Sequence, residues 1–115
     1  MKTVLVVDDQ PDVGDCLGAL LESAGYQVRM AYSGEQSLTA VAESRPDAVI
    51  LDIAMPSMSG YDVARILRKS YGSDLKLIAV SAWDDVRTRE LVKSSGFDAH
   101  LTKPAQLSDL NKLLS

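Results

Sequence analysis

The chain has 115 residues, of which 46% are hydrophobic and 24% charged, and its formal net charge is -4. This length and composition are typical of a globular protein, and we expect one domain over residues 1–115. An acidic chain is poorly suited to neutralise a phosphate backbone, which argues against direct nucleic-acid binding. No apolar run approaches the roughly 20 residues that span a bilayer, which argues against membrane insertion.

The first part of the chain alternates between strand and helix patterns. Residues 3–7 form a continuous apolar, β-branched run, and apolar residues then recur at helical spacing until Gly25. Residues 27–31 alternate in the manner of a less buried strand. The sequence SGEQ at residues 33–36 has the spacing of a capping box and predicts the start of a second helix, which ends by Pro46.

The helix predicted between the first two strands contains the only cysteine, Cys16. A lone cysteine cannot form a disulfide within the chain, and no signal pattern precedes the first strand, so we expect a cytoplasmic protein. Cys16 lies in an amphipathic stretch, where we expect it to act as a small buried apolar residue.

The rest of the chain repeats this alternation. Three further strands are predicted, at residues 48–51, 75–81 and 98–102. A helix is predicted after each of them by apolar residues at helical spacing: Val63, Ile66 and Leu67; then Val86, Leu91 and Val92, ending at Gly96; then Leu107, Leu110, Leu113 and Leu114. On the first of these helices we expect Arg65, Arg68 and Lys69 to be solvated.

Strands that alternate with helices and are almost continuously apolar are typical of a parallel sheet covered on both faces by right-handed crossovers. We therefore expect an α/β, doubly wound fold. In such folds the ligand site lies beyond the carboxyl ends of the strands, so the residues that follow each strand are the candidates for function.

Polar side chains stand at the carboxyl ends of four predicted strands: Asp8 and Asp9, Asp52, Ser81, and Thr102 with Lys103. Three nearby carboxylates repel one another unless a cation intervenes, and oxygen ligands without His or Cys favour Mg²⁺. A metal ion, a lysine and a hydroxyl group together suit the binding of a phosphoryl group, with one carboxylate as nucleophile. Asp52 is the candidate nucleophile because it stands alone at the end of a central strand.

The segments VVDDQPD, VILDIAMPSMSGYD, LIAVSA and HLTKP resemble, in order and spacing, the receiver domain of two-component response regulators. The resemblance covers the whole chain. It implies a CheY-like, flavodoxin-like fold with five parallel strands in the order 2-1-3-4-5. It also implies that a histidine kinase or a histidine phosphotransfer protein phosphorylates Asp52 in a reaction that requires Mg²⁺, and that this switches a signalling surface.

The same resemblance implies a ligand set for the metal. Asp9 and Asp52 would bind Mg²⁺ directly, together with the main-chain carbonyl of Ala54, and Asp8 would act through water.

On the phosphoryl side, the resemblance makes Ser81 the switch hydroxyl that turns toward the phosphoryl group, and Lys103 a contact of a phosphate oxygen. It also implies that the peptide bond between Lys103 and Pro104 is cis. Before proline the cis isomer costs roughly 0.5–1 kcal/mol relative to trans, which is less than before any other residue.

Two residues keep alternative interpretations. His100 occupies a position where the family commonly has tyrosine or phenylalanine; it is either a half-exposed histidine on an edge strand or a switch that moves inward on phosphorylation. Trp83 either shields the acyl phosphate from water or exposes its indole in a loop that contacts a partner.

Simpler structural roles exist for each candidate taken alone. Asp8 and Asp9 could cap the helix that begins near Pro11, Asp52 and Ser81 could stabilise turns, and Lys103 could be a surface lysine. Taken together, the convergence of these residues on one sheet edge favours the functional interpretation.

Three other classes of protein fit the sequence less well. An aspartyl-phosphate phosphohydrolase of the haloacid dehalogenase type needs an aspartate two residues after the nucleophile, where this chain has Ala54. A flavodoxin-like cofactor module would place a phosphate-binding loop where DDQPD stands. A receiver that is not phosphorylated would lack some of the acids or the lysine. Whether the receiver stands alone or belongs to a hybrid kinase or a longer regulator is left open by the sequence.

Overall fold

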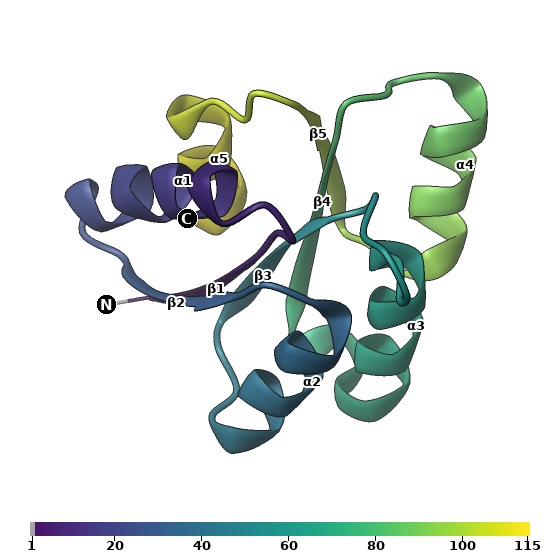
Figure 1. The fold of residues 1–115 in the computed structure, drawn as a ribbon, viewed down its shortest axis with the longest axis horizontal. Helices are drawn as coiled ribbons and strands as arrows, with labels where there is room; N and C mark the ends of the chain where they lie inside the picture. Colours follow the sequence, from purple (N-terminus) through teal and green to yellow (C-terminus); the bar gives the residue numbers. More distant parts are fainter. Residues whose placement is uncertain (1) are drawn as a thin grey trace.

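The computed structural model describes residues 2–115 (Figure 1). Its elements, in chain order, are β1 (Thr3–Val7), α1 (Pro11–Ser23), β2 (Gln27–Ala31), α2 (Gly34–Glu43), β3 (Ala48–Asp52), α3 (Gly60–Tyr71), the 3-10 turn η1 (Gly72–Asp74), β4 (Lys76–Ser81), α4 (Val86–Ser95), β5 (Ala99–Thr102) and α5 (Leu107–Leu114). The strands pair in parallel in the order β2-β1-β3-β4-β5. The predicted fold class and strand order are confirmed.

The sheet is covered by helices on both faces. Helices α1 and α5 lie on one face, and α2, α3 and α4 lie on the other (Figure 1). Successive residues of β1 alternate between the two layers: Val4 and Val6 pack toward α1 and α5, while Leu5 and Val7 pack toward α2 and α3. Because both faces are buried, the central strands are apolar except at their first or last residues, which is why their sequences show no alternation.

The starts of the first two helices differ in how they are capped. Ser33 is the N-cap of α2, and its side chain accepts a hydrogen bond from the N–H of Gln36 at 3.1 Å, as expected. The side chain of Gln36 accepts the N–H of Tyr32 instead of closing the predicted box. At α1 the N-cap is Gln10, with Pro11 in the first turn, so the simple view that Asp8 and Asp9 cap this helix is wrong.

The expectation for Cys16 is also wrong, because its side chain is exposed on α1. The buried positions of this helix are Gly14, Gly18 and Leu21, at spacings of four and three residues. Cys16 is two residues, or about 200°, from each of the two glycines, which places it on the outer side of the helix.

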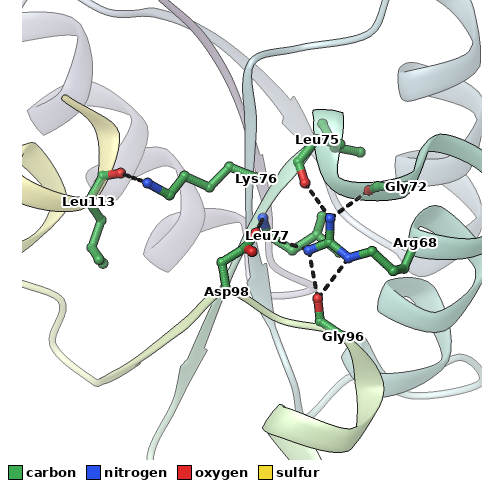
Figure 2. Close-up of polar contacts among 8 residues, drawn as sticks. All are labelled: Arg68, Gly72, Leu75, Lys76, Leu77, Gly96, Asp98 and Leu113. Atoms are coloured by element: carbon green, nitrogen blue, oxygen red, sulfur yellow. Dashed lines mark hydrogen bonds and ion pairs between the residues drawn. The ribbon is translucent and has the colours of Figure 1, made fainter.

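Arg68 contradicts the prediction that it is solvated. Only 22% of its side chain is exposed, and its guanidinium group bridges the end of α3 to the start of β4 and the end of α4 (Figure 2). It donates to the carbonyl oxygens of Gly96, Gly72 and Leu75 and to the carboxylate of Asp98, at distances of 2.6–2.9 Å. Arg65 and Lys69, on the same helix, are exposed as expected.

The carboxyl end of α5 is tied to the sheet by two lysines. Lys76 donates to the carbonyl oxygen of Leu113 (Figure 2), and Lys2 donates to that of Leu114. Positive charge at this end of a helix is favourable because the last carbonyl groups have no partner within the helix. Of the helices in residues 2–115, none combines the length and the apolar character that crossing a membrane requires.

Candidate functional site

Three carboxylates meet at the carboxyl ends of β1 and β3. These strands are neighbours, with Val7 paired to Leu51, so the residues that follow, Asp8 and Asp52, lie side by side. One oxygen atom from each of Asp8, Asp9 and Asp52 lies within 4.8 Å of the others. Asp8 and Asp52 are only 5% exposed, although charged groups are rarely buried without compensation.

Lys103 is the positive charge that the structure places beside this cluster. It follows β5, and its Nζ atom lies 3.4 Å from Oδ2 of Asp52 and 3.5 Å from Oδ2 of Asp8. The strand β4 separates β5 from β3, so only a long side chain can cross this distance. The peptide bond between Lys103 and Pro104 is cis, as the resemblance implies.

The electrostatics of the cluster are unbalanced. Burial raises the pKa of Asp52 from 3.8 to about 6; Lys103 lowers this pKa and the neighbouring charge of Asp8 raises it. One ammonium group therefore faces three carboxylates, and it does not restore an ordinary pKa to the most central of them. The carboxylate oxygens lie close together, and their negative charge exceeds the positive charge of Lys103. Such a set of oxygen donors fits a hard divalent cation such as Mg²⁺.

The loop after β3 holds the backbone of Asp52 close to the start of α3. The N–H of Ala54 donates to Oδ1 of Asp52 at 3.3 Å, and the N–H of Gly60 donates to the carbonyl oxygen of Ile53 at 2.9 Å. A Cβ atom on Gly60 would lie 2.6 Å from the carbonyl oxygen of Asp52, which is a clash with backbone. Glycine is thus required at this position by the close approach of α3 to the site.

Ser81, at the end of β4, is 2% exposed and makes its hydrogen bonds within its own turn and to β5. Its Oγ atom contacts the main-chain N–H and carbonyl groups of Trp83 at 2.9 and 2.6 Å, and Nε2 of His100 lies 3.3 Å away. The contacts with Trp83 could not be predicted from the sequence, because main-chain partners carry no side-chain signature. Trp83 is 67% exposed, which favours a role on the surface over shielding of the site.

His100 is only partly buried, on the edge strand β5, which agrees with the simpler of its two interpretations. Its contact with Ser81 nevertheless connects it to the sheet edge that carries the carboxylates.

A cleft of about 610 Å³ opens beside the carboxylates, between α1 and the loop that joins β5 to α5. Its lining includes the apolar residues Val13, Leu17 and Ala105 as well as Asp52 and Lys103. The cluster is therefore reached from the surface along this side of the sheet.

Comparison with known proteins identifies the family. The model of the response regulator receiver domain matches residues 4–115. The chain belongs to this family. Response regulator MprA of Mycolicibacterium vanbaalenii is 41% identical to this receiver domain over 107 residues, which are 93% of the chain and 46% of that protein. MprA of Mycobacterium avium is 40% identical over the same length. The receiver domain spans about half the length of the curated relatives it matches.

Solved structures of the same fold include response regulators from Vibrio cholerae and Thermotoga maritima. The chemotaxis protein CheY4 of Vibrio cholerae has a TM-score of 0.91 and 28% identity, over 99% of this receiver domain and 96% of that chain. The response regulator TrrA of Thermotoga maritima, whose structure is a complex with Mg²⁺-BeF, has a TM-score of 0.86 and 34% identity, over 97% and 95% of the two chains. This receiver domain is therefore a module of two-component signalling.

Proposed function

We propose that Asp52 is the phosphoacceptor of a two-component phosphorelay, that its phosphorylation requires Mg²⁺, and that the donor is a histidine kinase or a histidine phosphotransfer protein. The observation that carries this proposal is the burial of Asp52 among Asp8, Asp9 and Lys103, which leaves its pKa at about 6. The chain acts as a switch and catalyses only its own phosphorylation and dephosphorylation.

The ligand set that we assign to Mg²⁺ is the one that the family resemblance implies, and the carboxylates at the sheet edge are compatible with it. Asp9 and Asp52 would hold the ion directly with the carbonyl oxygen of Ala54, and Asp8 would act through a water ligand. When bound, Mg²⁺ offsets the negative charge of the carboxylates and of the phosphoryl oxygens. The complex of TrrA with Mg²⁺-BeF supports this assignment, since TrrA shares the fold and 34% of the sequence.

The phosphoryl transfer is a substitution at phosphorus. A carboxylate oxygen of Asp52 forms a bond to phosphorus as the bond from phosphorus to the donor's imidazole nitrogen breaks, and the electron pair stays on that nitrogen. Lys103, already 3.4 Å from Asp52, contacts an equatorial oxygen of the phosphoryl group. Ser81 then donates its hydroxyl hydrogen to another phosphoryl oxygen, which rearranges the loop after β4 and with it the signalling surface.

Intact-mass measurement after incubation with acetyl phosphate tests the proposal. We expect the wild-type chain to gain one phosphoryl group when Mg²⁺ is present and none when the metal is removed with EDTA. Asp52→Asn should gain none under either condition, because the amide is not a nucleophile. Asp74→Asn, which removes an exposed carboxylate in η1, is the matched control and should behave as the wild type.

Two outcomes would contradict the proposal. A phosphoryl group that is still added to Asp52→Asn would assign the nucleophile to another residue. A wild-type chain that is never modified, although it binds Mg²⁺, would indicate a binding module without phosphorylation.

A further inference from the structure

The cleft beside Asp52 has apolar walls for which phosphorylation does not account. Its volume is about 610 Å³, which lies within the range of sites that hold small organic molecules. A metal ion and a phosphoryl group are small and charged, and neither requires an apolar wall. Most of the residues that line the cleft are nevertheless apolar. The walls therefore suit a ligand with an apolar body.

One wall of the cleft is a stripe along helix α1. Val13, Cys16, Leu17 and Leu20 all line the cleft, and they stand at positions i, i+3, i+4 and i+7, which share one side of a helix. Val13 is 42% exposed and Leu20 is 46% exposed. Seven residues of helix separate these two, so the stripe is about 10 Å long. It forms a continuous apolar surface that the rest of the chain leaves accessible.

The charged residues of the cleft lie at one end of this stripe. Asp52 and Ile50 are two residues apart on the same face of β3, and Asp52 is the one at the carboxyl end of the strand. Because β1 and β2 are parallel, α1 returns from the carboxyl end of β1 to the start of β2. Its first turn, with Asp12 and Val13, therefore lies nearest the carboxylates, and Leu20 lies farthest from them. The cleft has a charged end and an apolar end.

The charged end carries an excess of negative charge. Asp8, Asp12 and Asp52 line the cleft, and Lys103 is the one basic residue that lines it within residues 2–115. Three carboxylates and one ammonium group leave an excess of two negative charges. A ligand with its own ammonium group has three N–H donors for these oxygen atoms, whereas an anionic ligand would be repelled.

We propose that this cleft is a binding site for a small organic cation, whose ammonium group lies among the carboxylates and whose apolar body lies along α1 from Val13 to Leu20. Charge complementarity at one end and apolar contact at the other select this class of ligand. The proposal goes beyond the phosphorylation of Asp52, and its main tests are made without a metal ion.

Alkylation of Cys16 measures whether the cleft is occupied. Cys16 is the only cysteine of the chain, it is exposed, and it lines the cleft, so the intact mass after treatment with iodoacetamide reports on one position. In EDTA at neutral pH, we expect octylamine to slow this alkylation in a saturable manner. If alkylation of the ligand-free protein slows as the protein concentration rises, a second copy of the chain covers the cleft and the proposal is wrong.

Three related compounds separate the contribution of charge from that of the apolar chain. Octylamine should bind about tenfold more tightly than octanol, because hydrogen bonds to charged groups are stronger than those between neutral groups. Methylamine has the charge without the chain, and octanoate has the chain with the opposite charge, so neither should protect Cys16 at the same concentration. Equal protection by octanol and octylamine, or stronger protection by octanoate, would overturn the proposal.

A substitution at the apolar end tests where the body of the ligand lies. Leu20→Gln should weaken the binding of octylamine by about three- to tenfold, because it removes part of the apolar contact. Ala19→Gln is the matched control, since Ala19 is exposed on the same helix but does not line the cleft, and it should stay within about twofold of the wild type. If Leu20→Gln binds octylamine as the wild type does, the ligand does not lie along α1.

A substitution at the charged end tests where the ammonium group lies. Asp12 is exposed and does not belong to the ligand set assigned to Mg²⁺, so Asp12→Asn removes one carboxylate of the cleft alone. Its affinity for octylamine should fall by about two- to fivefold. Asp74→Asn, far from the cleft in sequence and exposed in η1, should bind as the wild type does. An unchanged affinity in Asp12→Asn would contradict the placement of the ammonium group.

Phosphorylation provides a second readout, which rests on the function proposed above. Because Asp52 lines the cleft, octylamine should slow the gain of a phosphoryl group from acetyl phosphate and Mg²⁺, at amine concentrations that still protect Cys16 in the presence of Mg²⁺. An unchanged rate under these conditions would place the amine away from Asp52 and overturn the proposal. If the wild type never gains a phosphoryl group while octylamine protects Cys16 as expected, the function proposed for Asp52 fails and the ligand site stands.

Discussion

Replacing Asp52 with asparagine is expected to raise the free energy of unfolding of the metal-free protein by about 2 kcal/mol at about pH 7.5. The side chain of Asp52 is buried, and this burial raises its pKa from 3.8 to about 6. A shift of this size means that ionising the carboxyl group is harder in the folded chain than in the unfolded chain. Asparagine has nearly the same shape, carries no charge and can still accept the N–H of Ala54.

The sign of this effect follows from proton linkage. A carboxyl group with a higher pKa in the folded state binds its proton more tightly there, so the folded state is favoured where that proton is bound. Below about pH 4 the group is protonated in both states and costs nothing. As the pH rises from about 4 to about 6, the wild type loses stability relative to Asp52→Asn, and above that range the full difference remains.

Urea denaturation in EDTA, at several pH values across this range, measures the difference. Mg²⁺ should reverse the order of stability of the two proteins. At a free concentration 100 times its dissociation constant, the ion stabilises the wild type by about 2.7 kcal/mol, whereas Asp52→Asn has lost a ligand. Asp74→Asn, with its exposed carboxylate, should change stability by less than about 0.5 kcal/mol. If Asp52→Asn is instead the less stable protein in EDTA at neutral pH, the attraction of Lys103 outweighs the cost of burial.

The strands could be predicted from the sequence because the relevant signals are local and strong, whereas their order was implied only by the family resemblance. The strand at residues 3–7 and the one at 27–31 have the predicted bounds, and the third strand extends only one residue further, to Asp52. A continuous apolar run between turn signals leaves few alternatives in a chain that alternates strands with helices. The meeting of Asp8, Asp9 and Asp52 then follows from topology, since the carboxyl ends of parallel strands share one edge.

The features that could not be predicted from the sequence depend on how far a long side chain extends and on hydrogen bonds to main-chain groups. Arg68 has the periodicity of a surface residue, but its long side chain lies over the ends of neighbouring elements and donates to their carbonyl groups, which no pattern of side chains records. The turn of Ser81 is similar, because both groups of Trp83 that it contacts belong to the main chain. The exposure of Cys16 could not be predicted from its amphipathic stretch alone, because only one side of α1 faces the sheet and the apolar pattern does not show on which side Cys16 lies.

Replacing Arg68 with methionine is expected to lower the free energy of unfolding by about 2–4 kcal/mol. Methionine keeps much of the apolar stem of the side chain and removes all of its donors. The carbonyl oxygens of Gly96 and Leu75 then lose their contacts with the guanidinium group at part-buried positions, and Asp98 loses its ion pair (Figure 2). Urea denaturation, compared with the wild type under identical conditions, measures the loss.

Arg65 provides the matched control on the same helix. Its side chain is 52% exposed, and its ion pair with Asp62 spans 3.2 Å at the surface, so Arg65→Met should cost less than about 0.5 kcal/mol. Equal losses for the two variants would show that the contacts of Arg68 contribute no more than a surface charge does.

Arg68 also offers a way to separate stability from chemistry. Its partners Leu75 and Asp98 lie just before β4 and β5, whereas Ser81 and Lys103 lie at the other ends of these strands. Arg68→Met should therefore still accept one phosphoryl group from acetyl phosphate with Mg²⁺, at temperatures where it remains folded. Loss of phosphorylation in a folded Arg68→Met protein would mean that the two ends of the sheet are coupled, and that the helices on this face transmit strain to Asp52.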